Sequence, residues 1–356
     1  MSRYIRERYK GFQSYTPGEQ PKEMEYIKLN TNESPFPPAP GVCRKLEEAD
    51  MERLRLYPDP TGRRLKTMLA DRFRVEPENV FLANGSDDIL NFAMMAFNDD
   101  EDTLLFPDIS YSFYEVIANL HGVNFRKVPL KEDMTIDYRD YCRNDCNVII
   151  PNPNAPTGIA LSLEVIEEIV KANPNHVVLI DEAYVDFGAE SAVPLTKKYD
   201  NILISQTFSK SRSFAGGRLG FAIGNQELIR DLITLQYSTN PYSVNTLSLI
   251  LGSAAMEEEA YYRKNAEIIQ ENRKYTAETL TSMGFEVLPS KANFVFARRP
   301  GMDGDKLYRK LKEKGVLVRH FTTERIQDYV RITIGTKEQM DVLFEKLREI
   351  LQEDRR

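Results

Sequence analysis

The chain has 356 residues, of which 42% are hydrophobic and 28% are charged, and its formal net charge is −7. These values are typical of a globular protein that is long enough for a large core and two domains. Because nucleic-acid-binding surfaces are normally basic, the acidic balance argues against nucleic acid and favours small molecules as partners.

The predicted location is the cytoplasm. Residues 1–10 are rich in charge and lack the apolar segment of a signal peptide. The three cysteines are too few, and odd in number, for a disulfide framework, which fits a reducing compartment. The most apolar stretch, residues 244–256, is too short and too polar for a membrane span, so we expect a buried or interface helix there and no membrane partner. The three histidines lack metal-ligand spacing, and we expect no metal.

Two periodicities alternate through the first two thirds of the chain, after a proline-rich loop at residues 31–41. Helical apolar spacing occurs at 86–97, 110–121 and 161–173, where Ser162 suits the N-cap. Short apolar runs lie among these segments, at 81–84, 103–106, 123–128, 147–151, 176–180 and 201–205. Runs of Val, Ile and Leu without alternation predict strands covered on both faces, and hence an α/β fold with a largely parallel sheet and crossover helices.

The last hundred residues follow a different pattern. Better alternating runs at 285–289, 293–298, 316–321 and 329–334 are accompanied by helices around 303–313 and 336–353. This pattern predicts a smaller α+β domain with a mostly antiparallel sheet. A helical tract from about residue 241 to residue 283 would connect the two parts.

Polar residues follow four of the predicted buried strands. They occur at 85–87, 151–158, 181–187 and 206–210. In an open parallel sheet, ligands bind beyond the carboxyl ends of the strands, so these four groups predict one common site.

The residue types in this site suit a phosphate. Gly85 and Ser86 open a helix, whose N-terminal N–H groups and dipole attract anions. The hydroxyls of Thr207 and Ser209 and the guanidinium of Arg218 would complete the anion cradle.

Lys210 and Asp181 would supply the chemistry. Taken alone, Lys210 is most simply a solvated loop lysine and Asp181 an acidic strand end. A cationic neighbour and partial burial would lower the pKa of Lys210 and make its amine a usable nucleophile. Asp181 would hold a proton on a heteroaromatic nitrogen. A lysine, an acid and a phosphate cradle together are what pyridoxal phosphate requires of a protein.

Motifs in the same order carry a family resemblance over nearly the whole chain. The chain resembles fold-type-I pyridoxal-phosphate aminotransferases and, within them, is most similar to the histidinol-phosphate aminotransferases. The motifs are KLNTNESPF (28–36), YPDP (57–60), ANGSDDIL (83–90), PNPNAPTG (151–158), IDEAYVDF (180–187), TFSKSRSFAGGRLGF (207–221), VLVRHF (316–321) and VRITIGT (330–336). The resemblance implies a type I transferase fold with a large domain at 30–255 and a small α+β domain made of 1–29 and 256–356.

The resemblance also implies roles around the cofactor, pyridoxal 5′-phosphate. Lys210 forms the Schiff base and shuttles a proton, and Asp181 keeps the pyridine nitrogen protonated. Tyr184 donates to the ring hydroxyl, and Tyr111 stacks on the ring face. The phosphate is held by Gly85, Ser86, Ser209 and Arg218, with Thr207 as a further candidate.

Further implied contacts concern the partner subunit and the substrate. Tyr57 is expected to reach the cofactor phosphate of a neighbouring subunit, so we expect a homodimer. Arg331 binds the anionic group of the substrate, with Tyr15, Arg319 and Asn32 as additional pocket residues. In isolation, Arg331 would be read as an outward-facing charge and Tyr57 as a loop-packing residue.

One position departs from the family pattern. The family usually has an asparagine directly before Pro-Thr-Gly, and its amide hydrogen-bonds the ring oxygen of the cofactor. Here that position is Ala155. We expect Asn154 to take over this contact; the alternative is that Tyr184 makes it alone.

The predicted activity is transamination of histidinol phosphate with 2-oxoglutarate, in histidine biosynthesis. An aromatic amino-acid aminotransferase or a threonine-phosphate decarboxylase would use nearly the same cofactor residues. A non-catalytic cofactor-binding regulator and a nicotinamide-dependent dehydrogenase are the alternatives from other classes. The dehydrogenase would not depend on Lys210.

Overall fold

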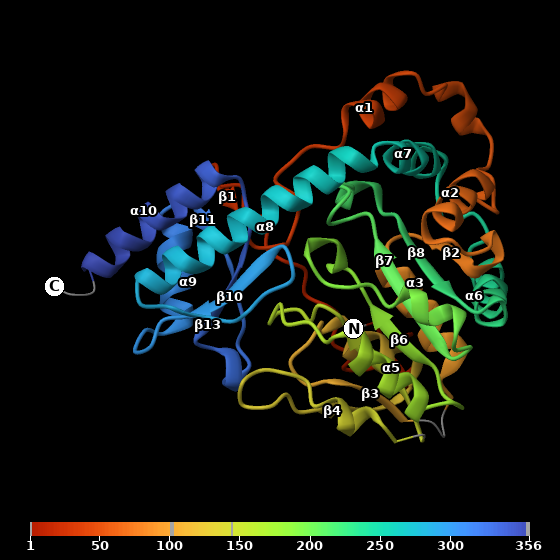
Figure 1. Cartoon of the computed structure of the whole chain (residues 1–356), viewed down its shortest axis with the longest axis horizontal. Helices are drawn as coiled ribbons and strands as arrows, with labels where there is room; N and C mark the ends of the chain where they lie inside the picture. Colours follow the sequence, from red (N-terminus) through yellow and green to blue (C-terminus); the bar gives the residue numbers. More distant parts are fainter. Residues whose placement is uncertain (1, 100–102, 144, 354–356) are drawn as a thin grey trace.

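The structure is a computed structural model and describes residues 2–99, 103–143 and 145–353 (Figure 1). The outer limits of the predicted small domain, residues 1 and 354–356, lie outside this range. Figure 1 shows two parts, a large sheet covered by helices and a smaller one beside it, joined by the long helix α8.

The large part contains a seven-stranded sheet. Its strands are β2 (Val80–Ala83), β3 (Thr103–Pro107), β4 (Asn124–Val128), β5 (Cys146–Pro151), β6 (Val178–Asp181), β7 (Ile202–Thr207) and β8 (Gly220–Gly224). Their order is β2-β8-β7-β6-β5-β3-β4. All neighbours pair in parallel except β8, which runs antiparallel to both β2 and β7. The predicted, largely parallel sheet is confirmed, although β8 was not predicted.

Helices cover both faces of this sheet. They are α1 (Pro40–Glu47), α2 (Arg63–Phe73), α3 (Ser86–Phe97), α4 (Phe113–His121), α5 (Leu163–Ala172), α6 (Gln226–Thr239) and α7 (Thr246–Glu257). One apolar core contains residues of α1, α2, α5 and α7, and the other contains residues of α3, α4 and α6. The Ser162 hydroxyl accepts a hydrogen bond from the N–H of Val165 at 3.5 Å, which confirms the predicted N-cap of α5.

Strand geometry explains the unbroken apolar runs. Successive side chains of a strand point to opposite faces. Val148 and Ile150 of β5 therefore pack in one core, and Ile149, between them, packs in the other. Both faces need apolar residues because both are covered by helices.

The smaller part contains an antiparallel sheet in the order β12-β13-β10-β9. The elements are β9 (Glu286–Val287), β10 (Phe294–Arg298), β12 (Arg319–His320) and β13 (Tyr329–Thr333), with helices α9 (Gly304–Glu313) and α10 (Lys337–Glu353). The single strand predicted at 316–321 is wrong. It divides at Val318 because β11 (Val316–Leu317) pairs in parallel with the N-terminal strand β1 (Ile27–Lys28), whereas β12 pairs with β13.

The helical tract predicted at 241–283 is two helices, α7 and α8 (Glu259–Ser282), which meet at Glu258. Tyr262 of α8 packs in a core of the large sheet, and Ile269 packs in the core of the small one. The division into residues 30–255 and residues 1–29 with 256–356 stays a prediction, and Tyr262, which it assigns to the small domain, packs with the large sheet. Within the described residues, no helix combines the length and apolarity that crossing a bilayer requires.

Candidate active site

A cavity of about 480 Å³ lies at the edge of the large sheet where β2, β5, β6 and β7 end and β8 begins. The N-terminal segment and the strands β12 and β13 form its other side. The cavity is lined by twelve of the residues that the sequence predicted for the site, namely Tyr15, Asn32, Ser86, Tyr111, Asp181, Tyr184, Thr207, Ser209, Lys210, Arg218, Arg319 and Arg331. Residues far apart in the chain thus meet as predicted from the strand ends.

Lys210 follows β7 and enters the cavity. Its Nζ donates to the backbone oxygen of Thr31 at 3.2 Å and lies 5.8 Å from the centroid of the Tyr184 ring. The loop that carries Lys210 is anchored by the two residues that follow it. Ser211 donates a short hydrogen bond to Asp186, and the buried Arg212 pairs with Glu259 of α8 at 2.8 Å. The loop is therefore held before any ligand binds.

Asp181 is the last residue of β6, and only 5% of it is exposed. Its Oδ2 accepts from the hydroxyl of Tyr114 at 2.7 Å, and its Oδ1 accepts from the N–H of Ala183 at 3.3 Å. Burial raises the pKa of Asp181 to about 6, although the two hydrogen bonds act in the opposite direction. A positively charged ligand atom beside this carboxylate would offset its desolvation.

The start of α3 forms an anion cradle together with the residues before β8. Gly85 has φ +84, a left-handed conformation that side chains rarely adopt. A Cβ on Gly220 would lie 2.7 Å from the backbone nitrogen of Ser86, so only glycine allows β8 to approach this closely. Arg218 donates to Asp87 at 3.2 Å, and Thr207 donates to the hydroxyl of Ser209 at 3.0 Å. Ser86 at the start of α3, two hydroxyls and one guanidinium therefore line the same cavity, which suits a phosphate.

Two arginines face the cavity from the small sheet. Arg319 of β12 and Arg331 of β13 are direct register partners, and neither forms an ion pair with a carboxylate of the described residues. Arg331 donates to the backbone oxygen of Asn30 at 3.0 Å. Its buried Nε has no hydrogen-bond partner among the described residues. Burial lowers the pKa of the Arg331 guanidinium. Like charges on opposed residues are unfavourable. An anion placed between them would remove this cost.

Comparison with known proteins identifies the family of this chain. Residues 24–347 match the model of aminotransferase class I and II. The chain belongs to this aminotransferase family. A histidinol-phosphate aminotransferase of Brachyspira hyodysenteriae is 48% identical over 99% of this chain and 100% of that one, and another of Syntrophus aciditrophicus is 47% identical over 94% and 95%.

Solved structures agree on the fold. A crystal structure described as a putative histidinol-phosphate aminotransferase from Erwinia carotovora atroseptica matches with a TM-score of 0.85 at 24% identity, over 92% of this chain and 97% of that one. A histidinol-phosphate aminotransferase from Clostridium acetobutylicum matches with a TM-score of 0.84 at 25% identity, over 91% and 98%. The predicted type I transferase fold is confirmed.

Enzymes of this family use pyridoxal phosphate, and the residues of the cavity fit that group. A lysine amine, a buried carboxylate and a glycine-lined cradle open into one space. The carboxylate lacks a cation partner among the described residues, which the protonated ring nitrogen would supply. The aminotransferase activity and the cofactor predicted from the sequence are therefore confirmed at the level of the family.

Asn154 is not oriented as the sequence prediction required. Its Nδ2 donates to the backbone oxygen of Ile109 at 3.0 Å and to the hydroxyl of Thr157 at 3.2 Å. Its Oδ1 is buried without a hydrogen-bond partner, and the cavity is lined by Ala155 instead. Asn154 precedes a turn at residues 155–157, and its amide nitrogen is already used in two contacts, so it does not replace the missing amide.

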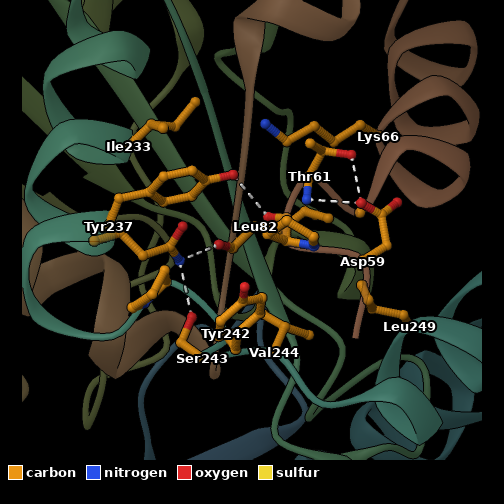
Figure 2. A pocket seen from close by; sticks show the side chains of 14 residues that line it. Asp59, Thr61, Lys66, Leu82, Ile233, Tyr237, Tyr242, Ser243, Val244 and Leu249 are labelled. Carbon is orange, nitrogen blue, oxygen red and sulfur yellow. Dashed lines mark hydrogen bonds between the residues drawn. The ribbon is translucent and has the colours of Figure 1, made fainter. Parts of the chain in front are cut away.

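Tyr57 lies outside the cavity and is 79% exposed. Its ring stacks on that of Tyr242, with centroids 4.4 Å apart. Figure 2 shows how the following turn is held: Asp59 accepts hydrogen bonds from Thr61, and Tyr237 donates to the backbone oxygen of Pro60 at 3.1 Å. Tyr57, directly before this turn, is therefore exposed and does not line the cavity of its own chain.

Two contributors to the site were given no role by the sequence, although Asp87 lies in the predicted group 85–87. Tyr114 holds Asp181, but its helical apolar spacing indicated a core residue. Asp87 accepts from the hydroxyl of Tyr111 at 3.0 Å as well as from Arg218. A polar first turn beside a phosphate site was the available signal for Asp87, whereas no sequence signal pointed to Tyr114.

Proposed function

We propose that this aminotransferase transfers the amino group of histidinol phosphate to 2-oxoglutarate, forming imidazole acetol phosphate and glutamate in histidine biosynthesis. The observation that carries the proposal is the pair Arg319 and Arg331, which faces the same cavity as Lys210 and has no carboxylate partner among the described residues. Both amino donors, histidinol phosphate and glutamate, are anionic. The full-length relatives that bear this name support the choice of substrate.

Pyridoxal phosphate, when bound, supplies a carbonyl carbon for amine attack and an electron sink for charge that develops at the substrate. We assign to Lys210 the covalent attachment of the cofactor and the transfer of a proton at the substrate α-carbon. Asp181 keeps a proton on the ring nitrogen, and its contact with Tyr114 holds the carboxylate in place.

The remaining cofactor contacts are assigned to residues of the anion cradle and to Tyr111. The N–H group of Ser86, the hydroxyl of Ser209 and the guanidinium of Arg218 would hold the phosphate, and Thr207 orients Ser209. The predicted role of Gly85 is limited to its backbone conformation, because its N–H donates to the backbone oxygen of Ala83 at 2.9 Å. The ring of Tyr111 would cover one face of the cofactor, and its hydroxyl donates to Asp87.

The substrate end of the cavity is assigned to Arg331 and Arg319, with Tyr15. Arg331 would bind the phosphate of histidinol phosphate in one half-reaction and a carboxylate of glutamate in the other. Tyr15 packs edge-on against Tyr111 and Phe113, with centroids 5.8 Å apart in both pairs, and so extends the aromatic wall towards the arginines.

We further propose that the enzyme is a cytoplasmic homodimer in which Tyr57 contacts the cofactor phosphate of the partner subunit. Large exposed hydrophobic side chains occur on α1, segment 51–57, α6, α7 and the loop between these last two helices. They are Leu46, Met51, Leu54, Leu56, Tyr57, Tyr237, Tyr242 and Ile250. Exposed apolar side chains of this size are typical of an interface, which a second copy would cover. The free cysteines fit a reducing compartment.

The decisive experiment mixes cofactor-loaded protein with one amino donor at a time and follows the cofactor spectrum. The donors are histidinol phosphate, glutamate, phenylalanine, tyrosine and phosphothreonine. We expect rapid conversion with histidinol phosphate and glutamate. Conversion by phosphothreonine with release of carbon dioxide, or by aromatic amino acids alone, would contradict the proposal.

A further inference from the structure

Asn32 forms an unusual set of hydrogen bonds at the wall of the cavity. It is buried and has φ +57, in the left-handed region. Its backbone N–H donates to the hydroxyl of Thr333 at 3.0 Å, and that hydroxyl lies 3.0 Å from its Oδ1. Its Nδ2 lies 2.9 Å from the hydroxyl of Tyr184.

The donor and acceptor groups set the direction of this series of hydrogen bonds. The Thr333 hydroxyl accepts from the N–H of Asn32 and donates its single proton to Oδ1. The amide nitrogen must then be the group that meets Tyr184, and it can only donate. The Tyr184 oxygen is thereby used as an acceptor, and its own proton is free for an acceptor in the cavity.

Further contacts hold each member in place. Asn293 donates to the backbone oxygen of Asn32 at 3.0 Å, and the N–H of Thr333 donates to the backbone oxygen of Leu29 at 2.9 Å. The ring of Tyr184 packs edge-on against Phe294 at 5.1 Å, beside Ala155. An asparagine amide at position 155 would lie in this apolar cluster. A methyl group there supports the ring of Tyr184 instead.

We propose that Thr333 and Asn32 are positioning residues that direct the Tyr184 hydroxyl to the ring oxygen of the cofactor, and that this relay serves in place of the amide absent at Ala155. The inference rests on the proposed use of the cavity for pyridoxal phosphate. It changes the expectation for Asn32, which acts on the cofactor side of the cavity rather than on the substrate.

The consequence is measurable without turnover. A donor to the ring oxygen stabilises negative charge on it, and so lowers the pH at which the nearby imine nitrogen loses its proton. This proton loss changes the visible absorption of the lysine-bound cofactor. The other charged or titratable groups that face Tyr184 are Lys210, Arg331, Tyr111 and Tyr114, and changing Thr333 alters none of them.

The first test is Thr333→Val, which keeps the shape of the side chain and removes the hydroxyl. We expect the midpoint of the absorption change to rise by about half a pH unit, a fraction of a charge-assisted hydrogen bond. Thr333→Ser should return it to the wild-type value. Thr276→Val is the control, because this buried hydroxyl donates to the backbone oxygen of Asn272 within α8, away from the cavity lining. A midpoint in Thr333→Val equal to that of the control would overturn the proposal.

The second test distinguishes a relay of hydrogen bonds from Thr333 through Asn32 to Tyr184 from a general disturbance of the cavity wall. Asn32→Gly removes the amide while accepting the left-handed backbone. It should raise the midpoint at least as much as Thr333→Val, and adding Thr333→Val to it should have no further effect. An equal additional rise in the double variant would show that Thr333 acts independently of Asn32, against the proposal. Wild-type protein that takes up no cofactor would instead contradict the proposed function.

Discussion

The two ends of the cavity are built on different principles. At the edge of the large sheet, Lys210, Asp181 and the cradle come from strand ends and are held by neighbours such as Tyr114 and Glu259. At the small sheet, Arg319 and Arg331 stand opposite each other without a carboxylate among the described residues. The proposed cofactor end is organised in advance, whereas the proposed substrate end retains unbalanced charge. The cofactor stays bound through the reaction cycle, but the substrate end must accept two different anions and release them.

Among the variants that test this difference between the two ends, removal of the Lys210 amine should reduce activity most. Lys210→Ala should reduce kcat by roughly 10⁴-fold or more, because the group that attaches the cofactor and moves the proton is lost. Circular dichroism should stay native, and the visible band of the lysine-bound cofactor should be absent. Lys198→Ala, a surface lysine paired with Glu167, is the control. Turnover within tenfold of wild type would contradict the assignment.

Asp181→Asn should reduce activity and yet stabilise the protein without cofactor. We expect kcat to fall about 10²- to 10³-fold through lost stabilisation of the ring nitrogen. In the folded apoprotein the pKa of Asp181 is raised from 3.8 to about 6. The folded state therefore binds more protons than the unfolded state, and its stability falls as pH rises from about 4 to 6.

Removing this titration should make the apoprotein of Asp181→Asn up to about 3 kcal/mol more stable at pH 7 than wild type. Urea unfolding at pH 4 and pH 7 measures the difference. An equal loss of stability between these pH values in both proteins would assign the effect to another group.

At the substrate end, Arg331→Ala should mainly raise KM for histidinol phosphate and for glutamate. Loss of a charge-assisted hydrogen bond is worth about 1.5–3 kcal/mol, or roughly 10- to 150-fold in kcat/KM. Arg319→Ala should act in the same direction. Arg298→Ala, in the adjacent strand but paired with Glu286 outside the cavity, is the matched control. Unchanged kinetics of Arg331→Ala for both donors would remove it from the substrate site.

The smallest effect is expected at the subunit boundary. Tyr57→Ala should weaken cofactor binding about 2- to 10-fold, the value of one hydrogen bond. Mixing it with Lys210→Ala should restore tight binding at one of the two sites of each mixed dimer, or about a quarter of all sites after random exchange of subunits. Monomers in sedimentation, or mixed protein without recovery, would refute the role across the interface.

Local patterns predicted much of the fold and the groups at the strand ends. Helix α3 was predicted at its observed bounds because its apolar spacing begins directly after Gly85. The run at 316–321 was misread, since its division depends on two partners, β1 and β13, that are distant in the chain. Strand β8 was missed because Gly220–Gly224 is short and bounded by glycines.

The sequence by itself determined the layered α/β architecture, the family and the lysine, carboxylate and cradle, because each depends on a few adjacent residues and on the direction of parallel strands. Only the tertiary structure decided that Asn154 turns away, that Tyr114 holds Asp181, and that Thr333 and Asn32 reach Tyr184. Hydrogen-bond partners over such separations depend on side-chain direction and on how two cores pack, which no local pattern encodes.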